Sequence, residues 1–400
     1  MTSPDAAAPA DWSARADEAA RSVTRMFGQR LFFLPGTHIA AIERPSSRLK
    51  NLSRPWHYWW QAHYVDCLVD ASRRELARGA RFDGGSRPSA GRLASQLVTG
   101  IRLRNFLTFV NNYYDDMAWL ALSTLRLEKL AEETRKPGSR RHARIRRSLT
   151  LQFDSASTDD LGGGTFWSKK RDFKNTPATA PVALYYARTG NPAKAQALVD
   201  WLHAKLFNPA QGMYQDGLRI GAGGEVVLEA AIYTYNQGPV LGALLELGGQ
   251  GNLDRAAALV DAVSRNLTRP TTLKSGRTAA VLRCDGTGDG GLFTGILARY
   301  LALAAVDGRL PDRTRAIAAA LVAETAQALW EGRRAVDPEE PLAGYDAHLV
   351  FPVFPETPAG GSYPAGAAVE LSTQLQAWMM LEAAAAVQAA GQATRPDAPN

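Results

Sequence analysis

The sequence predicts an all-α protein, an (α/α)6 barrel in which six helical hairpins form two concentric layers of helices. Apolar residues recur with helical periodicity through most of the 400 residues, and no long stretch alternates apolar and polar residues as a strand would. Helices of two kinds alternate along the chain. These observations favour the barrel over an α-solenoid, for which we find no sequence repeat of fixed period.

Helix caps and helix breakers divide the chain into about twelve predicted helices. Gly190-Asn191-Pro192 separates one pair of neighbours, and Gly248-Gly249-Gln250-Gly251 separates another. Pro311 stands near the first turn of its helix, where a missing N–H leaves no hydrogen bond unmade. The predicted helices are 12–28, 58–78, 93–109, 114–133, 138–152, 176–190, 192–206, 230–247, 252–267, 290–306, 311–330 and 366–390.

The composition of each helix predicts the layer to which it belongs. Polar helices rich in Arg, Asp and Glu alternate with nearly apolar helices. DRTRAIAAALVAETAQAL at 312–329 is an example of the first kind, and LFTGILARYLALAA at 292–305 is an example of the second. A helix that is apolar on most faces is buried all round, and an amphipathic helix covers it. We therefore expect one domain at 11–391, between disordered tails at 1–10 and 392–400.

The segments that lead into the inner helices are rich in aromatic, glycine and polar residues. If the inner helices run in the same direction, these segments meet at one end of the barrel. The unpaired N–H groups of the helix starts then point into a shared cleft. The segments are 54–66, 111–116, 162–175, 229–238, 283–293 and 354–370.

The chain is basic, with a formal net charge of +7, and much of the excess lies in RKPGSRRHARIRR at 135–147. Such a run is most often a solvated outer helix, and a peripheral contact with an anionic glycolipid or a membrane surface is the alternative. No zinc-finger or RNP signature accompanies it, so nucleic acid is not an expected partner. The oligomeric state is left open.

Several classes of protein lack support in the sequence. No apolar run is long enough to span a bilayer and no signal peptide is recognised, so we expect a cytoplasmic protein, although export is not excluded. Cys67 and Cys284 are expected to be buried free thiols. Metal-ligand spacings, phosphate loops and dinucleotide fingerprints are not found, and no metal or cofactor is expected.

The residues at the predicted cleft suit a polyhydroxylated ring. Aromatic faces stack on the C–H faces of such a ring, while carboxylates and amides bind its hydroxyls. The aromatic set is Trp56, Trp59, Trp60, Tyr113, Tyr114, Phe166, Trp167, Tyr233, Tyr235 and Tyr363. The polar set is Asp115, Asp116, Asp172, Lys174, Asn175, Asn236, Gln237, Asp285 and Asp289.

Two consecutive acids, Asp115 and Asp116, begin one of the inner helices. An N-cap role explains one aspartate well and two less well. The alternative is a glycosidase pair, in which one carboxylate attacks the anomeric carbon and its protonated partner donates to the leaving oxygen. The helix N-terminus would hold one of them as the anion, and that charge would raise the pKa of the other.

At these positions the sequence resembles glycoside hydrolase family 76, the endo-α-1,6-mannanases, from about residue 56 to residue 385. The most specific match is YYDDMAWLAL at 113–122, which is similar to that family's Tyr-Asp-Asp followed by Trp in a helix. Supporting matches are HYWWQAH at 57–63, GGGTFW at 162–167 followed by KN at 174–175, YTYNQG at 233–238 and DGGLFTGILARYL at 289–301.

The resemblance implies an (α/α)6 barrel and a retaining hydrolase of α-mannosidic, in particular α-1,6, linkages in an oligo- or polysaccharide. It implies that Asp115 is the nucleophile and that Asp116 is the acid/base. The candidate substrate-binding residues are Trp59, Trp60, Tyr114, Trp167, Asn175, Tyr235, Asn236, Gln237 and Asp289.

Other functions stay open at this point. The same acid pair serves a transglycosylase, and a glycan-binding protein without catalysis would keep the aromatic residues. A sugar epimerase would use His57 and His63, which we expect instead to be structural residues hydrogen-bonded within the Trp-rich helix start. The substrate could be a trimmed mannoside, a lipid-linked mannan intermediate or another α-linked glycan, cut internally or from an end.

Overall fold

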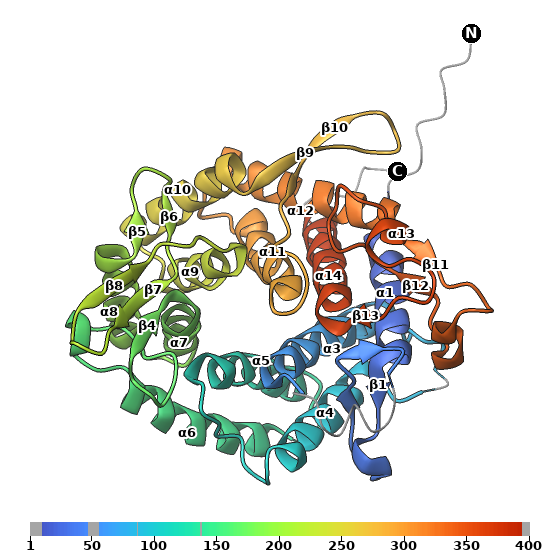
Figure 1. The fold of residues 1–400 in the computed structure, drawn as a ribbon, viewed down its shortest axis with the longest axis horizontal. Helices are drawn as coiled ribbons and strands as arrows, with labels where there is room; N and C mark the ends of the chain where they lie inside the picture. Colours follow the sequence, from blue (N-terminus) through green and yellow to red (C-terminus); the bar gives the residue numbers. More distant parts are fainter. Residues whose placement is uncertain (1–9, 47–55, 86, 137, 394–400) are drawn as a thin grey trace.

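The structure, a computed structural model, describes residues 10–46, 56–85, 87–136 and 138–393 (Figure 1). Of the predicted disordered tails, only Ala10, Gln392 and Ala393 are among these residues, and the last two end a helix. No helix in the described ranges is both long and apolar enough to cross a membrane. Cys67 and Cys284 are buried free thiols, as predicted.

Six inner helices form a closed ring in which each helix packs on the next, so the predicted (α/α)6 barrel is confirmed (Figure 1). Their side chains are buried on nearly all faces because helices of both layers surround them. The inner helices are α3 (Tyr58–Arg78), α5 (Tyr114–Glu133), α7 (Thr176–Arg188), α9 (Thr234–Leu247), α11 (Gly290–Val306) and α14 (Leu371–Ala393).

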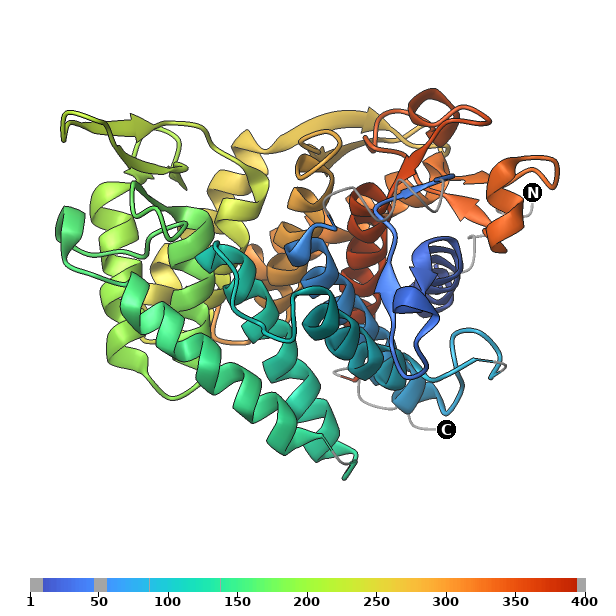
Figure 2. The same cartoon turned by 60° about the horizontal axis from the view of Figure 1, so that its bottom comes forward.

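The outer helices alternate with the inner ones along the chain and pack against them (Figures 1 and 2). Each of the twelve predicted helices is present. The outer helices are α1 (Trp12–Phe27), α4 (Ala90–Arg104), α6 (Ser139–Ala156), α8 (Pro192–Lys205), α10 (Gln250–Asn266) and α12 (Asp312–Gly332).

The last helix begins later than predicted, at Leu371 instead of residue 366. Val369 and Glu370 form strand β13, which pairs with β3 (Glu43–Arg44) at the other end of the sequence. The backbone of Leu371 also donates to Ile42, at 2.9 Å. This long-range pairing keeps the segment before Leu371 extended.

Short strands occupy the connections from outer to inner helices, and the sequence did not predict them. In one sheet, β4 (Phe173–Asn175), β7 (Gly217–Ile220) and β8 (Val226–Glu229) lie side by side. A hairpin of β9 (Thr268–Thr272) and β10 (Thr278–Leu282) packs on α12. The remaining strands are β1 (Gly28–Gln29), β2 (Ile39–Ala40), β5 (Phe207–Asn208), β6 (Met213–Tyr214), β11 (Arg334–Ala335) and β12 (Leu349–Val350).

Glycines allow the inner helices to approach one another closely. A Cβ atom at Gly295 of α11 would lie 2.9 Å from the Cα of Gln376 on α14. A Cβ at Gly242 of α9 would lie 2.6 Å from the ring of Tyr300 on α11. Such contacts are far inside van der Waals range, so the ring of helices requires glycine at both positions.

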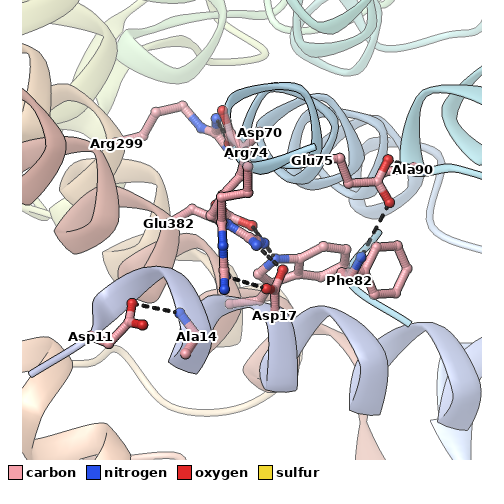
Figure 3. A network of polar contacts seen from close by, with 12 residues as sticks. Asp11, Ala14, Asp17, Asp70, Arg74, Glu75, Phe82, Ala90, Arg299 and Glu382 are labelled. Carbon is pink, nitrogen blue, oxygen red and sulfur yellow. Dashed lines mark hydrogen bonds and ion pairs between the residues drawn. The ribbon is translucent and has the colours of Figure 1, made fainter. Parts of the chain in front are cut away.

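A buried ionic network joins α1, α3 and α14 (Figure 3). The guanidinium of Arg74 on α3 donates to both carboxylate oxygens of Glu382 on α14, at 3.1 and 2.7 Å, and also pairs with Asp17 of α1. The indole N–H of Trp378 donates to Glu382 at 2.8 Å. Because each charge has an opposite partner and hydrogen bonds, the network can lie between the two layers.

Candidate active site

The starts of the inner helices meet at one end of the barrel, as the sequence predicted. The indole N–H of Trp60, at the start of α3, donates to Asp289 just before α11, at 2.8 Å. Thr234, at the start of α9, donates to Asp285 at 2.6 Å. The backbone of Gly288 donates to Glu370, next to the start of α14, at 2.6 Å.

The start of α5 is fixed by the 162–175 segment. The N–H of Tyr114 donates to the carbonyl of Trp167 at 2.8 Å, and Tyr113 forms an antiparallel bridge with Ser168. Tyr113 is the N-cap residue and makes no side-chain capping bond, so neither Asp115 nor Asp116 occupies the N-cap position. Both acids lie in the first helical turn, and both are half-buried.

The two carboxyl groups have different hydrogen-bond partners. Asp115 accepts the indole N–H of Trp167 at 2.9 Å and the backbone N–H of Asp116 at 2.9 Å. Asp116 accepts the side-chain N–H of Asn111 at 2.7 Å. Donors to a carboxylate stabilise its charged form, and Asp115 has the larger share of them.

The pKa values of the two acids differ in the direction that these hydrogen bonds predict, with that of Asp115 the lower. Burial raises the pKa of Asp115 to about 7, against the bonds from Asp116 and Trp167, which lower it. Burial, followed by the charge of Asp115, raises the pKa of Asp116 well above its usual range. Asp115 is therefore the acid that ionises first as pH rises, while Asp116 keeps its proton beside it.

Aromatic rings flank the acids. Tyr235 stacks on Phe293 with ring centroids 3.8 Å apart, and Trp59 lies 6.4 Å from Tyr235. Tyr113 lies 5.0 Å from Trp167 on the other wall. Trp59, Trp167 and Tyr235 are half-buried, so part of each ring faces outward and is available for stacking.

A glycine-containing loop positions Trp167. Gly164 has a φ of +78°, and a Cβ there would lie 2.7 Å from the ring of Trp201. The buried ammonium of Lys174 donates to backbone carbonyls of Gly163 and Gly164 at 2.8 and 3.1 Å. Burial lowers the pKa of Lys174 to about 8. This cation organises the loop that carries the partner of Asp115.

Three predicted substrate-binding residues are buried, and the side chains of two of them are held by hydrogen bonds within the protein. Asn175 is buried and caps α7 by accepting the N–H of Ala178 at 3.1 Å. The buried amide of Gln237 accepts the N–H of Tyr214 at 2.9 Å and donates to its carbonyl at 2.8 Å. Tyr114 is 3% exposed. These residues position the walls, and a substrate contact stays a prediction for each.

Trp60, Asp289 and Asn236 also lie around the acids. Trp60 is buried beneath the exposed carboxylate of Asp289, whose charge raises the pKa of Asp115 and Asp116. The buried Asn236 donates to Asp216 at 3.2 Å, and its side-chain oxygen has no partner among the described residues.

Sequence reasoning gave no role to Asn111, Asp216 or Phe293, all of which belong to this end. Asn111 begins the predicted cleft segment 111–116, NNYYDD, so its spacing from Asp116 was the available signal. Phe293 is the last residue of DGGLF at 289–293, the start of a predicted helix. Asp216 comes from β-structure that was not predicted, and burial raises its pKa to about 6.

The two histidines do not form an acid/base pair. His57 stacks on Trp60 with centroids 4.1 Å apart, and its Nδ1 lies 3.7 Å from Asp289. His63 is buried, and burial lowers its pKa to about 3. The expectation that His63 is hydrogen-bonded is wrong, because neither ring nitrogen has a partner in the described chain. It packs against Trp119 at 4.8 Å instead.

No group of three or more His, Cys, Asp or Glu side chains in the described ranges is arranged to hold a metal ion. Paired carboxyl groups with unequal pKa values beside aromatic faces, at the helix-start end of an (α/α)6 barrel, are the equipment of a glycoside hydrolase. The sequence profile of glycosyl hydrolase family 76 matches residues 12–387. The chain belongs to this family of glycosidases.

Solved structures agree with this assignment. The GH76A α-1,6-mannanase of Salegentibacter sp. HEL1_6 is 26% identical, with a TM-score of 0.74 over 94% of this chain and 100% of that one. An inactive variant of that enzyme, with two consecutive aspartates replaced by asparagine, was solved with α-1,6-mannotriose. The Lin0763 protein of Listeria innocua, 22% identical, shares the fold with a TM-score of 0.73 over 95% of this chain and 98% of that one. A search of curated proteins finds no match.

Proposed function

We propose that the protein is a retaining glycosidase that hydrolyses α-mannosidic linkages, specifically α-1,6 linkages, in a mannan or a mannose-containing glycan. The observation that supports it most is the unequal bonding of the adjacent acids Asp115 and Asp116. The Salegentibacter enzyme, inactive when two consecutive aspartates are replaced and solved with α-1,6-mannotriose, supports the same substrate and the same type of acid pair.

In the first step, an oxygen of the Asp115 carboxylate attacks the anomeric carbon. The glycosidic C–O bond breaks, and its electron pair leaves with the departing oxygen, which takes the proton of Asp116. The product is a covalent glycosyl-enzyme at Asp115. With that charge lost, the pKa of Asp116 falls because the like charge beside it is gone.

In the second step, the carboxylate of Asp116 removes a proton from water. The water oxygen attacks the anomeric carbon and displaces Asp115, which returns to the carboxylate form that Trp167 stabilises. Two inversions give net retention of configuration. Asp116 is protonated again and the cycle closes.

The test begins with α-1,6-, α-1,2- and α-1,3-linked mannans and the sizing of their products. We expect cleavage of the α-1,6 polymer with α-configured new ends in proton NMR. Asp115→Asn and Asp116→Asn should each lower turnover by about 10²–10⁴-fold or more. Ordinary activity in either variant would show that these roles are wrong, and longer products at high acceptor concentration would identify a transglycosylase.

Azide rescue separates the two roles. In Asp115→Ala, azide should enter from the face that the carboxylate vacated and give the β-mannosyl azide. In Asp116→Ala, it should displace Asp115 from the intermediate and give the α-azide. If Asp115→Ala gave the α-azide and Asp116→Ala gave the β-azide, Asp116 would be the nucleophile and Asp115 the acid/base.

A further inference from the structure

Two apolar side chains project from the surface between α4 and α5. Phe106 is 89% exposed and Leu107 is 63% exposed. Their φ angles are +53° and +65°, in the left-handed region that bulky L-residues seldom adopt. The chain thus keeps a strained backbone that presents two large hydrophobic groups to solvent.

Hydrogen bonds fix the loop of residues 105–109 in this conformation. The N–H of Leu107 donates to the carbonyl of Arg102 at 2.8 Å, and the Arg102 guanidinium returns a bond to the carbonyl of Leu107 at 3.0 Å. The side chain of Asn105 donates to the carbonyls of Thr108 and Val110 at 3.0 and 3.2 Å. The exposure of the two apolar groups is therefore a defined feature of the fold.

A groove of about 640 Å³ lies beside the loop, and it is strongly basic. No carboxylate lines it among the described residues, and no ion pair to a described carboxylate neutralises its arginines. Burial, and then the charge of Arg102, lower the pKa of Arg141. The groove is lined chiefly by Arg102, Arg140, Arg141, Arg144, Leu107 and Ile145.

The outer face of α6 continues this surface. Arg140, Arg144 and Arg147 are exposed at helical spacing, and Leu151, 68% exposed, follows on the same face. Like charges at this spacing repel one another and destabilise an isolated helix. An anionic partner would remove that repulsion.

We propose that the 105–109 loop and the arginine face of α6 form one docking surface for an anionic phospholipid bilayer. Arginine binds phosphate groups through paired N–H donors, and Phe106 and Leu107 would enter the boundary between head groups and acyl chains. A nucleic acid fits less well, because stacking on successive bases needs several aromatic faces and this pair offers one, Phe106, beside an aliphatic Leu107. Two residues after the loop, Asn111 donates to Asp116 of the acid pair at 2.7 Å.

The experiment measures sedimentation of the full chain with vesicles of phosphatidylcholine alone or with 30% phosphatidylglycerol, each with and without added salt. We expect binding to the anionic vesicles that falls as salt rises. Arg140→Gln/Arg144→Gln should weaken it about 5-fold per arginine. The charge-matched control is Lys274→Gln/Arg313→Gln, exposed residues elsewhere, which should bind as the parent does.

Phe106→Ser/Leu107→Ser should weaken vesicle binding on the order of 10-fold or more. Its matched control is Leu303→Ser/Val306→Ser, which removes two exposed apolar groups near the end of α11. A fluorophore on Phe106→Cys should shift to the blue with anionic vesicles, and the buried native cysteines leave that label specific.

Several results would overturn the proposal. They are equal binding to neutral and anionic vesicles, no vesicle binding, binding of soluble glycerol phosphate alone, or equal losses in the control variants. Binding of single-stranded RNA that competes with vesicles and survives Phe106→Ser/Leu107→Ser would assign the arginines to nucleic acid. None of these measurements depends on glycosidase activity, so they test the docking surface independently of the proposed reaction.

Discussion

Trp167→Phe isolates the contribution of one hydrogen bond to the chemistry. The substitution keeps an aromatic ring but removes the N–H that donates to Asp115 at 2.9 Å. A hydrogen bond to a charged group contributes about 1.5–3 kcal/mol, and one pKa unit corresponds to about 1.4 kcal/mol. Because the lost donor stabilised the anion, the pKa of Asp115 should rise by about 1–2 units.

The rise has a calculable effect on rate. With a pKa of about 7, half of Asp115 is ionised at pH 7. A rise of about 1–2 units leaves roughly 9% to 1% ionised, so kcat/KM at pH 7 should fall about 5- to 50-fold. The deficit should shrink as pH increases, because the carboxylate is restored before Asp116 loses its proton.

The assay is the pH profile of kcat/KM on an α-1,6-mannooligosaccharide from pH 4 to pH 10. The acidic limb should move to higher pH in Trp167→Phe. Trp201→Phe is the matched control, since it removes an indole N–H that donates to the carbonyl of Leu161 at 3.0 Å, next to the same loop, without removing a donor to Asp115. An acidic limb that stays in place, or moves to lower pH, would refute the role given to the indole.

Three further predictions concern stability. Asp116→Asn should raise Tm by about 1–3 °C at pH 8 and leave it unchanged at pH 3, as measured by differential scanning fluorimetry. The reason is that a carboxyl group with a raised pKa in the folded state destabilises that state only at pH values above its pKa in the unfolded state. Glu382→Gln should lower the free energy of unfolding, measured in urea, by about 3–5 kcal/mol. Glu133→Gln, which breaks an exposed ion pair, should lower it by less than about 1 kcal/mol. Gly295→Ala should lower the free energy of unfolding by about 1–3 kcal/mol, because the added methyl group overpacks the contact between helices. Gly251→Ala, at a position with open space around it, should not destabilise the protein. Equal effects of the two substitutions would contradict the packing argument.

Helical periodicity was sufficient to predict the barrel because burial dictates it. An inner helix such as α11 is enclosed by neighbours, so its sequence is apolar on all faces, and the outer helices show one polar face. The same reasoning predicted the common end of the inner helices, and hence the neighbourhood of Asp115, Trp167 and Tyr235. Helix boundaries were less exact: the predicted helix 93–109 ends at Arg104, before the left-handed residues Phe106 and Leu107, and the last helix begins at Leu371, after a long-range strand.

The β-strands, and the residues that support the site from behind the two acids, could not be predicted from helical periodicity. The strands are short, and although β7 pairs locally with β8, it also pairs with β4, about forty residues earlier in the sequence and on the other side of a helical hairpin. Asp216 reaches the site only through that sheet. The amides of Asn175 and Gln237 look available in sequence, but the fold uses them for a helix cap and for the Tyr214 backbone.

The different roles proposed for the two acids arise only in part from the helix on which both of them lie, through the backbone N–H of Asp116 that donates to Asp115. Asp115 and Asp116 occupy the same first turn, so the positive end of the α5 dipole acts on both and distinguishes neither. The donors also differ: Asp115 accepts the backbone N–H of Asp116 and the indole N–H of Trp167, whereas Asp116 accepts the side chain of Asn111. The Lys174-organised loop that presents Trp167 is therefore part of the proposed catalytic machinery, because it supplies a donor to Asp115 that α5 itself does not provide.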